Sequence, residues 1–150
     1  MMSERFRAQF EFAREGIFKD LEGVSPEIFD VQPKGLPNTV HWQLGHILLS
    51  AEGFLFGANG QLPAQYNEYF GYGSRPSSWN EGVPSVETLV EQLKSQLERI
   101  KGISEDRFQD ALPEPVIGNH TYGELVNFTA CHELTHAGQI HVMLKAAQAE

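Results

Sequence analysis

Four stretches of the chain place apolar residues at every third or fourth position, which is the pattern of a helix with one buried face. We expect helices over residues 3–21, 39–56, 85–101 and 122–147. The third stretch follows the helical period most closely, through its apolar residues Val86, Leu89, Val90, Leu93, Leu97 and Ile100. Nothing between these stretches has the pattern of a strand. Four amphipathic helices predict an all-α four-helix bundle, with residues 1–150 in a single domain.

Residues that cap helices mark where these stretches begin. Ser3 and Asn38 stand at the starts of the first two, and their side chains can accept a hydrogen bond from a free backbone N–H of the first turn. Thr121 and Glu124 form a Thr-x-x-Glu capping box directly before the fourth stretch. Gly102 follows the third stretch and is expected to end it.

The connection over residues 57–84 is unusually long for a compact bundle. It has no sustained period and is rich in Gly, Pro, Asn and Tyr. Loops of this length are usually functional or mobile, and this one would allow a crossover between the second and third helices. Its aromatic residues could either orient a substrate or simply pack the loop down: Tyr66, Tyr69, Tyr72 and Trp79.

The composition argues against several classes of partner. The chain has 20 Asp and Glu against 11 Lys and Arg, a formal net charge of −9, so neither nucleic acid nor an anionic membrane is expected as a partner. The one cysteine excludes an intramolecular disulfide and suits a reducing compartment. Residues 1–16 lack the apolar core of a signal peptide, and no stretch is apolar for long enough to span a bilayer. We therefore expect a cytoplasmic protein.

Three of the six histidines share the core side of the predicted bundle. His132 and His136 lie about 40° apart on one face of the last helix, within its apolar stripe. His46 lies on the inward face of the second helix, next to Trp42 in projection. His41 falls on the back of that helix, and His141 points outward from the last one. The inward histidines come from two helices that can face each other.

Buried imidazoles need partners for their nitrogens, because desolvation of an unpaired polar group is costly. A divalent metal ion would satisfy one nitrogen from each of these histidines. Imidazole suits zinc, nickel, copper and iron, among which zinc and nickel are the first candidates. The alternative is a metal-free bundle in which the histidines bond to each other and to water. Cys131 lies about 100° to one side of His132, so we expect a packed or partly exposed thiol there rather than a fourth ligand.

Residues 132–136 also match the His-Glu-x-x-His pattern of zinc peptidases, in which the glutamate acts as a general base. Glu133 is accordingly a weak candidate for a catalytic residue. A small bundle has little room for a peptide cleft, so we expect Glu133 either to support the site from behind the ligands or to be solvated.

Two segments resemble a known family. Residues 42–48, Trp-Gln-Leu-Gly-His-Ile-Leu, resemble the Trp-x-x-Gly-His-(Ile/Leu) signature in the second helix of the DinB/YfiT-like metalloprotein superfamily. Residues 132–140 resemble that superfamily's His-x-x-x-His-x-Gly-Gln-(Ile/Leu) motif in the last helix. The resemblance implies an up-down-down-up bundle, often a homodimer, with a metal held by His46, His132 and His136.

The resemblance also implies a range of activities. Related proteins include transferases and isomerases that use bacillithiol, mycothiol or glutathione, and many have no known activity. We expect a metal-dependent thiol S-transferase that joins a low-molecular-weight thiol to a small electrophile. The alternatives are a non-catalytic metal-binding or stress-related module and, with less support, a metal-dependent hydrolase.

Overall fold

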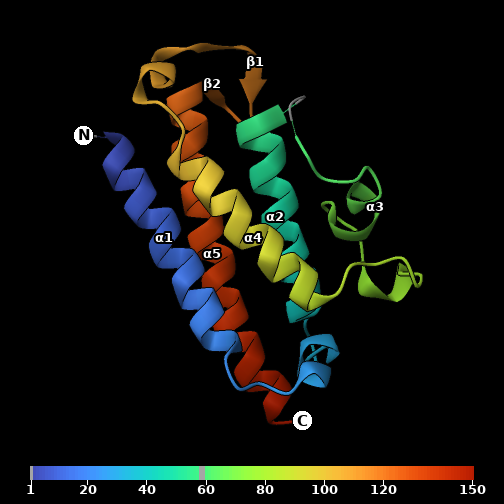
Figure 1. Ribbon diagram of the computed structural model, residues 1–150. Coiled ribbons are helices and arrows are strands. Elements are labelled where there is room, and N and C mark those ends of the chain that lie inside the picture. The colour runs from blue at the N-terminus through green and yellow to red at the C-terminus, as the bar shows by residue number, and fades with distance from the viewer. Residues whose placement is uncertain (1, 58–59) are drawn as a thin grey trace.

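The computed structural model describes residues 2–57 and 60–150 (Figure 1). Residues 58 and 59 of the predicted connection 57–84 lie outside this described part. Four long helices dominate, as the sequence predicts: α1 (Met2–Leu21), α2 (Val40–Phe56), α4 (Val86–Lys101) and α5 (Tyr122–Gln148). None of the described helices combines the length and apolarity needed to cross a membrane.

The helices follow the up-down-down-up order. In Figure 1, α1 and α5 run from the upper to the lower end of the bundle, whereas α2 and α4 run from the lower end to the upper. Because α2 and α4 are parallel, the chain between them must return along the length of the bundle, which explains the long connection. Helix α5 packs against both α1 and α2.

Two of the predicted helix starts are confirmed and two are wrong in detail. Thr121 and Glu124 form the full capping box of α5. The start of α2 is capped by Thr39, whose hydroxyl accepts from the backbone N–H of Trp42 at 3.1 Å, and not by Asn38. Ser3 lies inside α1, which already begins at Met2. Ser85 caps α4, at the predicted boundary.

Asn38 and Ser3 have other partners. The side-chain oxygen of Asn38 accepts from Gln43 Nε2 at 3.1 Å, which places it beside α2 rather than on its end. The hydroxyl of Ser3 donates to Glu105 Oε2 at 2.8 Å and ties α1 to the segment after α4. Asn, Ser and Thr have similar capping ability, so the sequence alone does not separate Asn38 from its neighbour Thr39.

The expectation that no strand is present is wrong. Strands β1 (Ala111–Val116) and β2 (Asn119–Thr121) form an antiparallel hairpin before α5. Ile117 and Gly118, at the turn, have φ values of 48° and 75°. β1 contains two prolines and is mostly exposed, so it lacks the alternation of a half-buried strand.

Aromatic residues pack the crossover segment, which is the described part of the connection over residues 57–84, onto the bundle. It contains a short helix, α3 (Tyr66–Phe70), and the 3₁₀ turn Pro76–Ser78. Tyr66 is buried and its hydroxyl donates to Gln92 of α4 at 2.8 Å, while Trp79 Nε1 donates to the Tyr69 carbonyl at 2.9 Å. Packing therefore accounts for three of the four aromatic residues, whereas the Tyr72 side chain is fully exposed.

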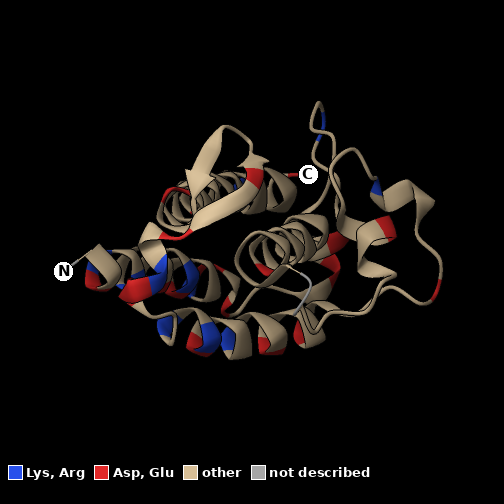
Figure 2. Cartoon of the chain, turned by 90° about the horizontal axis from the view of Figure 1, so that it is seen from above, with Lys and Arg blue, Asp and Glu red and all other residues tan. Residues whose placement is uncertain are grey.

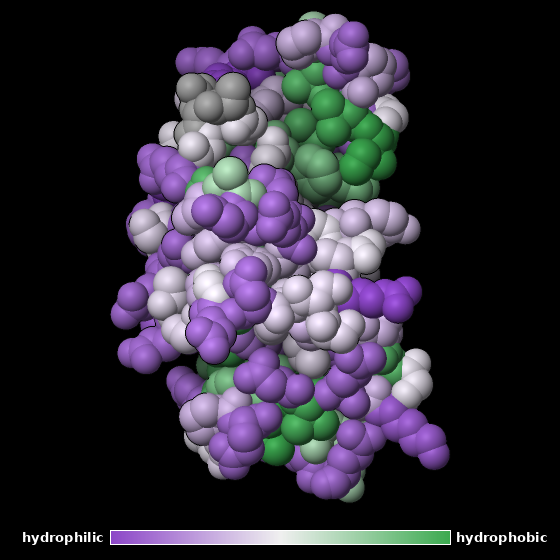
Figure 3. Space-filling view, turned by 90° about the vertical axis from the view of Figure 1, so that its right-hand side faces the viewer, coloured by the Kyte–Doolittle hydropathy of each residue, from purple (hydrophilic) through white to green (hydrophobic). Residues whose placement is uncertain are grey.

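The surface that carries this segment is mostly hydrophilic (Figure 3). An apolar area lies at its upper end, where α2 ends and the hairpin begins. Phe54 and Phe56 near the end of α2 are only partly buried, and Ile117 at the hairpin turn is 63% exposed. The crossover segment thus leaves the last turns of α2 accessible.

A polar layer divides the interior into two apolar clusters. One cluster lies toward the lower end and includes Leu48, Phe70 and Leu93; the other lies toward the upper end and includes Phe10 and Leu55. Between them every long helix contributes a buried polar or charged residue: Arg14, Glu52, Gln96 and Glu133.

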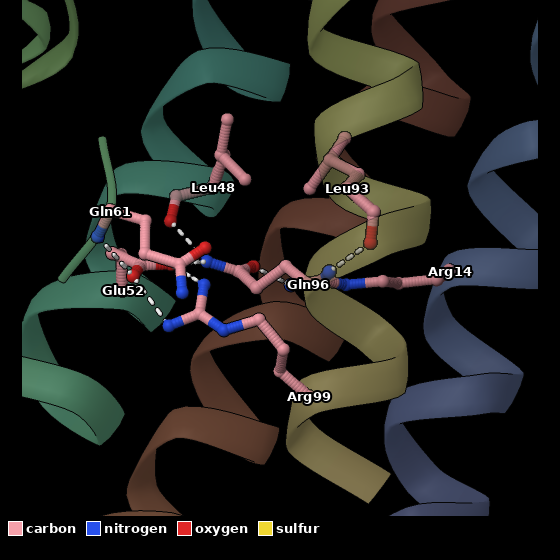
Figure 4. Close-up of polar contacts among 7 residues, drawn as sticks. All are labelled: Arg14, Leu48, Glu52, Gln61, Leu93, Gln96 and Arg99. Atoms are coloured by element: carbon pink, nitrogen blue, oxygen red, sulfur yellow. Dashed lines mark hydrogen bonds and ion pairs between the residues drawn. The ribbon is translucent and has the colours of Figure 1, made fainter. Parts of the chain in front are cut away.

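Hydrogen bonds join this layer across the four helices, and Figure 4 shows those among α1, α2 and α4. Arg14 donates to Gln96 Oε1 and to the Leu93 carbonyl, both at 2.6 Å, and also binds Glu133. Gln96 donates in turn to Glu52 Oε1 at 2.9 Å. Among the described residues, every buried side-chain nitrogen and oxygen has a hydrogen-bond partner. The layer is therefore fully paired, as a buried polar network must be if it is to be stable.

A candidate metal centre

Three histidines from two helices meet at one point. His46 on α2 and His132 and His136 on α5 each offer a ring nitrogen, and these nitrogens lie within 4.8 Å of one another. The Nε2 atoms of His132 and His136 are 3.1 Å apart. His46 is 7% exposed, and the other two are half-buried. The histidines that the helical projection places on the core side are thus the ones that the fold brings together.

Hydrogen bonds on the far side of two rings set which nitrogen faces the cluster. The Phe70 carbonyl lies 2.8 Å from His46 Nδ1, and Gln43 Oε1 lies 2.5 Å from His136 Nδ1. Both oxygens are acceptors, so each Nδ1 carries the proton. A neutral imidazole has only one N–H, and each Nε2 therefore keeps a free lone pair.

The amide of Gln43 is itself held in place. Its Nε2 donates to Asn38 Oδ1 and to Gln139 Oε1, each at 3.1 Å. With both donor bonds directed to oxygens, its own oxygen is left to accept from His136. Outer partners of this kind fix the orientation of histidines that bind metals.

A glycine allows the crossover segment to reach His46. A Cβ atom at Gly45 would lie 2.2 Å from the ring of Phe70, so a larger residue there would push α3 away from α2. The close approach brings the Phe70 carbonyl to His46. On another side, the Trp42 ring stacks on the His46 ring, with 4.6 Å between centroids and 12° between planes.

The environment of the cluster keeps its imidazoles neutral. Burial lowers the pKa of His132 to about 4 and that of His136 to about 3, and the neighbouring histidines add to both shifts. Burial also lowers the pKa of His46. Lys and Arg gather on α1 and α4 (Figure 2), whereas α2 has none and α5 has only Lys145, near its end. The two helices that carry the histidines therefore bring little positive charge against a cation.

Comparisons with known proteins agree with this geometry. The family model described as DinB superfamily matches residues 9–140, which include all three histidines of the cluster. The chain belongs to the DinB superfamily. Its fold is similar to the crystal structure of a conserved protein from Enterococcus faecalis, with a TM-score of 0.73 and 13% identity over 99% of this chain and 98% of that one. A search of curated proteins found no match.

In this DinB-superfamily chain, Glu133 lies in neither of the two positions expected from the sequence, which were a solvated position and one behind the metal ligands. It is 1% exposed, so the expectation of a solvated side chain is wrong. Its Oε1 accepts from Arg14 Nη2 at 3.1 Å and its Oε2 accepts from Arg14 Nε. Both oxygens are taken up by a permanent cation, so this carboxylate has a structural role between α5 and α1 and is poorly placed to act as a base.

The remaining candidates of this DinB-superfamily chain lie outside the cluster. His41 is buried on another side of α2, with its ring nitrogens 2.8 Å from Asp30 Oδ1 and from the Pro84 carbonyl. His141 is exposed and lies 3.0 Å from Asp20. Cys131 is exposed and is not part of the histidine cluster.

Sequence reasoning missed the outer partners of the histidines. Gln43 is a polar residue in an otherwise apolar turn of α2, one turn before His46, and that position is a usable signal. The carbonyl of Phe70 gives no signal, because any residue has one and its location depends on how the crossover segment folds.

Proposed function

We propose that this chain binds a divalent metal ion through His46, His132 and His136. The observation that carries the proposal is the convergence of three imidazoles, two of which place Nδ1 beside an oxygen acceptor and so direct the lone pair of Nε2 toward the cluster. Neutral nitrogen donors in this number suit zinc or nickel. Three protein ligands leave a coordination position for water or a substrate, which is typical of catalytic rather than structural sites.

We further propose that the site serves a thiol S-transferase. A bound metal ion would lower the pKa of a coordinated thiol and so supply a nucleophilic thiolate. The electrophile could pack on the partly exposed rings of Phe54 and Phe128, which lie beside His132 with ring centroids 6.2 Å from its own. Thiolate attack needs no protein base, and this agrees with the engagement of Glu133 by Arg14.

A non-catalytic metal-binding module is the second candidate. It also agrees with the pairing of Glu133, the weak catalytic candidate of the sequence, because this carboxylate is held by Arg14 and a binding module needs no catalytic residue. The same observation weighs against a hydrolase, which would need a base to activate water.

Metal content tests the ligand set. We expect the purified chain, dialysed against zinc or nickel, to hold about one ion per chain by elemental mass spectrometry. His136→Ala should hold far less, whereas His141→Ala, which removes an exposed histidine of the same helix, should hold as much as the original. Equal content in His136→Ala and the original would rule out this ligand set.

A conjugation assay separates transferase from module. Metal-loaded protein is incubated with bacillithiol, mycothiol or glutathione and with an aryl chloride or an epoxide, and thioether products are measured by mass spectrometry. The transferase predicts product above that formed by His46→Ala, which keeps the rest of the surface. No excess with any thiol, in protein that holds metal, would favour the module.

We also propose that the chain forms a homodimer, as its family resemblance implies. In support, Val142 on α5 is 61% exposed and lies at a hollow of about 460 Å³ lined in part by Leu36 and Met143. Light scattering should give twice the chain mass of 16.8 kDa, and Val142→Glu should reduce it to one chain mass.

A further inference from the structure

A second hollow lies at the lower end of the bundle, where α1 ends and α4 begins (Figure 1). Its volume is about 740 Å³, within the range of pockets that bind small molecules. The last turn of α1, the segment that follows it and the first turns of α4 form its walls. His41 also lines it, and this residue lies about 140° around α2 from His46. The groove is therefore distinct from the metal centre.

The walls of the groove are largely apolar. Phe29 is buried beneath it, and the other apolar lining residues are partly exposed: Phe18, Leu21, Val24, Val86 and Val90. An apolar group that covered these side chains would be removed from water together with them, which is favourable. The groove thus offers a surface for the apolar body of a ligand.

The rim of the groove is negative. Glu22, Glu87 and Glu91 are exposed along it, and none of them has an ion-pair partner among the described residues. Lys94 is the one Lys or Arg in the lining, and its ammonium group lies 5.3 Å from the centre of the Phe18 ring. The Phe18 ring in the wall therefore already attracts one cation. The three unpaired carboxylates leave the rim with a net negative charge even when Lys94 is counted.

His41 and Asp30, which also line the groove, are hydrogen-bonded within the chain. Asp30 lies 2.8 Å from His41 Nδ1, and the Pro84 carbonyl lies 2.8 Å from His41 Nε2. His41 consequently has no ring nitrogen left for a ligand. Recognition of a charged group at this place falls to the glutamates.

We propose that this groove binds a small organic cation, an amine or quaternary ammonium with an aromatic body. The aromatic body lies against Phe29 and Val90, and the ammonium group lies among Glu22, Glu87 and Glu91. Both features of the groove are needed for this ligand class, because an apolar wall alone accepts neutral and anionic molecules equally well.

The test compares three ligands that differ mainly in charge. Phenethylammonium, 2-phenylethanol and 3-phenylpropanoate are titrated into the full, isotopically labelled chain, and dissociation constants are taken from amide chemical-shift changes. We expect the cation to bind about fivefold or more tightly than the alcohol at low salt, with the anion weakest. The difference should shrink in high salt, because exposed charges are screened.

Variants locate the site. Glu87→Gln with Glu91→Gln should bring the cation down to the affinity of the alcohol, whereas Glu98→Gln, on α4 outside the groove, should not. Val90→Trp should block all three ligands, and an unchanged circular dichroism spectrum and melting temperature would show that the chain still folds.

Three results would overturn the proposal. One is equal affinity for cation and alcohol, another is shift changes confined to residues outside the groove, and the third is binding of a basic peptide with no binding of the small cation. None of these depends on the metal centre, so loss of the metal proposal would leave the outcome readable.

Discussion

Gly45 and Gln43 control the geometry of the histidines without being ligands. Gly45 sets how closely Phe70 approaches α2, and Gln43 holds the ring of His136. Both residues lie within one turn of His46. The meeting of the three histidines proposed as ligands could be predicted from helical projection, because three positions on two helices share an inward face. The part played by Gly45 could not, since it depends on a ring that arrives from the crossover segment.

Gly45→Ala should weaken metal binding and the fold together. The added methyl group meets the Phe70 ring, so we expect a loss of about 1–3 kcal/mol in the free energy of unfolding. Displacement of the Phe70 carbonyl from His46 should reduce metal affinity by about tenfold or more. Urea unfolding and competition with a metal-sensitive dye measure the two effects.

Gly53→Ala is the matched control on the same helix. A Cβ atom at Gly53 would meet nothing within 4 Å. Alanine is the better helix former, so this variant should be equally stable or more stable by up to about 1 kcal/mol, with unchanged metal affinity. Similar losses in both variants would contradict the role given to Gly45.

Acid should destabilise the metal-free chain through the histidine cluster. The pKa of His132 is lowered to about 4 and that of His136 to about 3, from 6.5. Between these values and pH 6.5 the unfolded chain binds protons that the folded chain does not, so stability is full above about pH 6.5 and falls as pH decreases. The urea midpoint should therefore drop between pH 7 and pH 4.5.

The stability of a variant that lacks one of these imidazoles should depend less on pH than that of the original chain. His136→Gln removes the group with the largest shift, and its urea midpoint should drop less over the same range. His141→Gln, at an exposed position of α5, should follow the original chain. A drop of the same size in all three proteins would show that other groups cause it.

The polar layer connects all four long helices to one another. It lies between two apolar clusters, and each long helix contributes to it at least one buried side chain that is hydrogen-bonded to another helix. This layer was not predicted, because Arg14 and Glu133 look like ordinary surface residues in a sequence that has many charges. The hairpin was missed for a related reason: β1 is mostly exposed and carries no apolar alternation.

Arg14→Met should destabilise the bundle strongly. It leaves Glu133 buried without its cation, and breaking a buried pair in this way costs about 3–5 kcal/mol. Arg14→Met combined with Glu133→Leu should recover much of the loss, because no charge is then left unpaired. Urea unfolding measures both variants, with Arg5→Met at an exposed position of α1 as the control. A single variant as stable as that control would show that the pair contributes little.

The order of the helices links the site to the overall stability of the molecule. Helices α2 and α5 have to stay in contact for the histidines to meet. A metal ion bound by all three histidines would therefore stabilise the folded chain and not the unfolded one. The length of the connection between the second and third helices allows a crossover, and the up-down-down-up order itself is implied by the family resemblance. The path of that connection could not be predicted, because its residues follow no period and its order comes from aromatic contacts such as that between Tyr66 and Phe70.

Zinc should raise the melting temperature of the chain. At a free concentration 100 times the dissociation constant the stabilisation is about 2.7 kcal/mol, which corresponds to roughly 5–10 °C for a chain of this size. Differential scanning calorimetry with zinc and then with a chelator measures the shift. His132→Ala should show almost none, and a full shift in that variant would place the ion elsewhere.

The bond between the Phe70 carbonyl and His46 has a consequence for how this chain can vary. Because the acceptor belongs to the peptide backbone, exchanging the Phe70 side chain for one of similar bulk leaves the acceptor in place, and substitutions at position 70 alone would not reveal it. Removing or adding one residue upstream of α3 would instead move that oxygen out of reach while every histidine stays intact. Insertions and deletions in this segment are therefore expected to disturb the orientation of His46 in the proposed site.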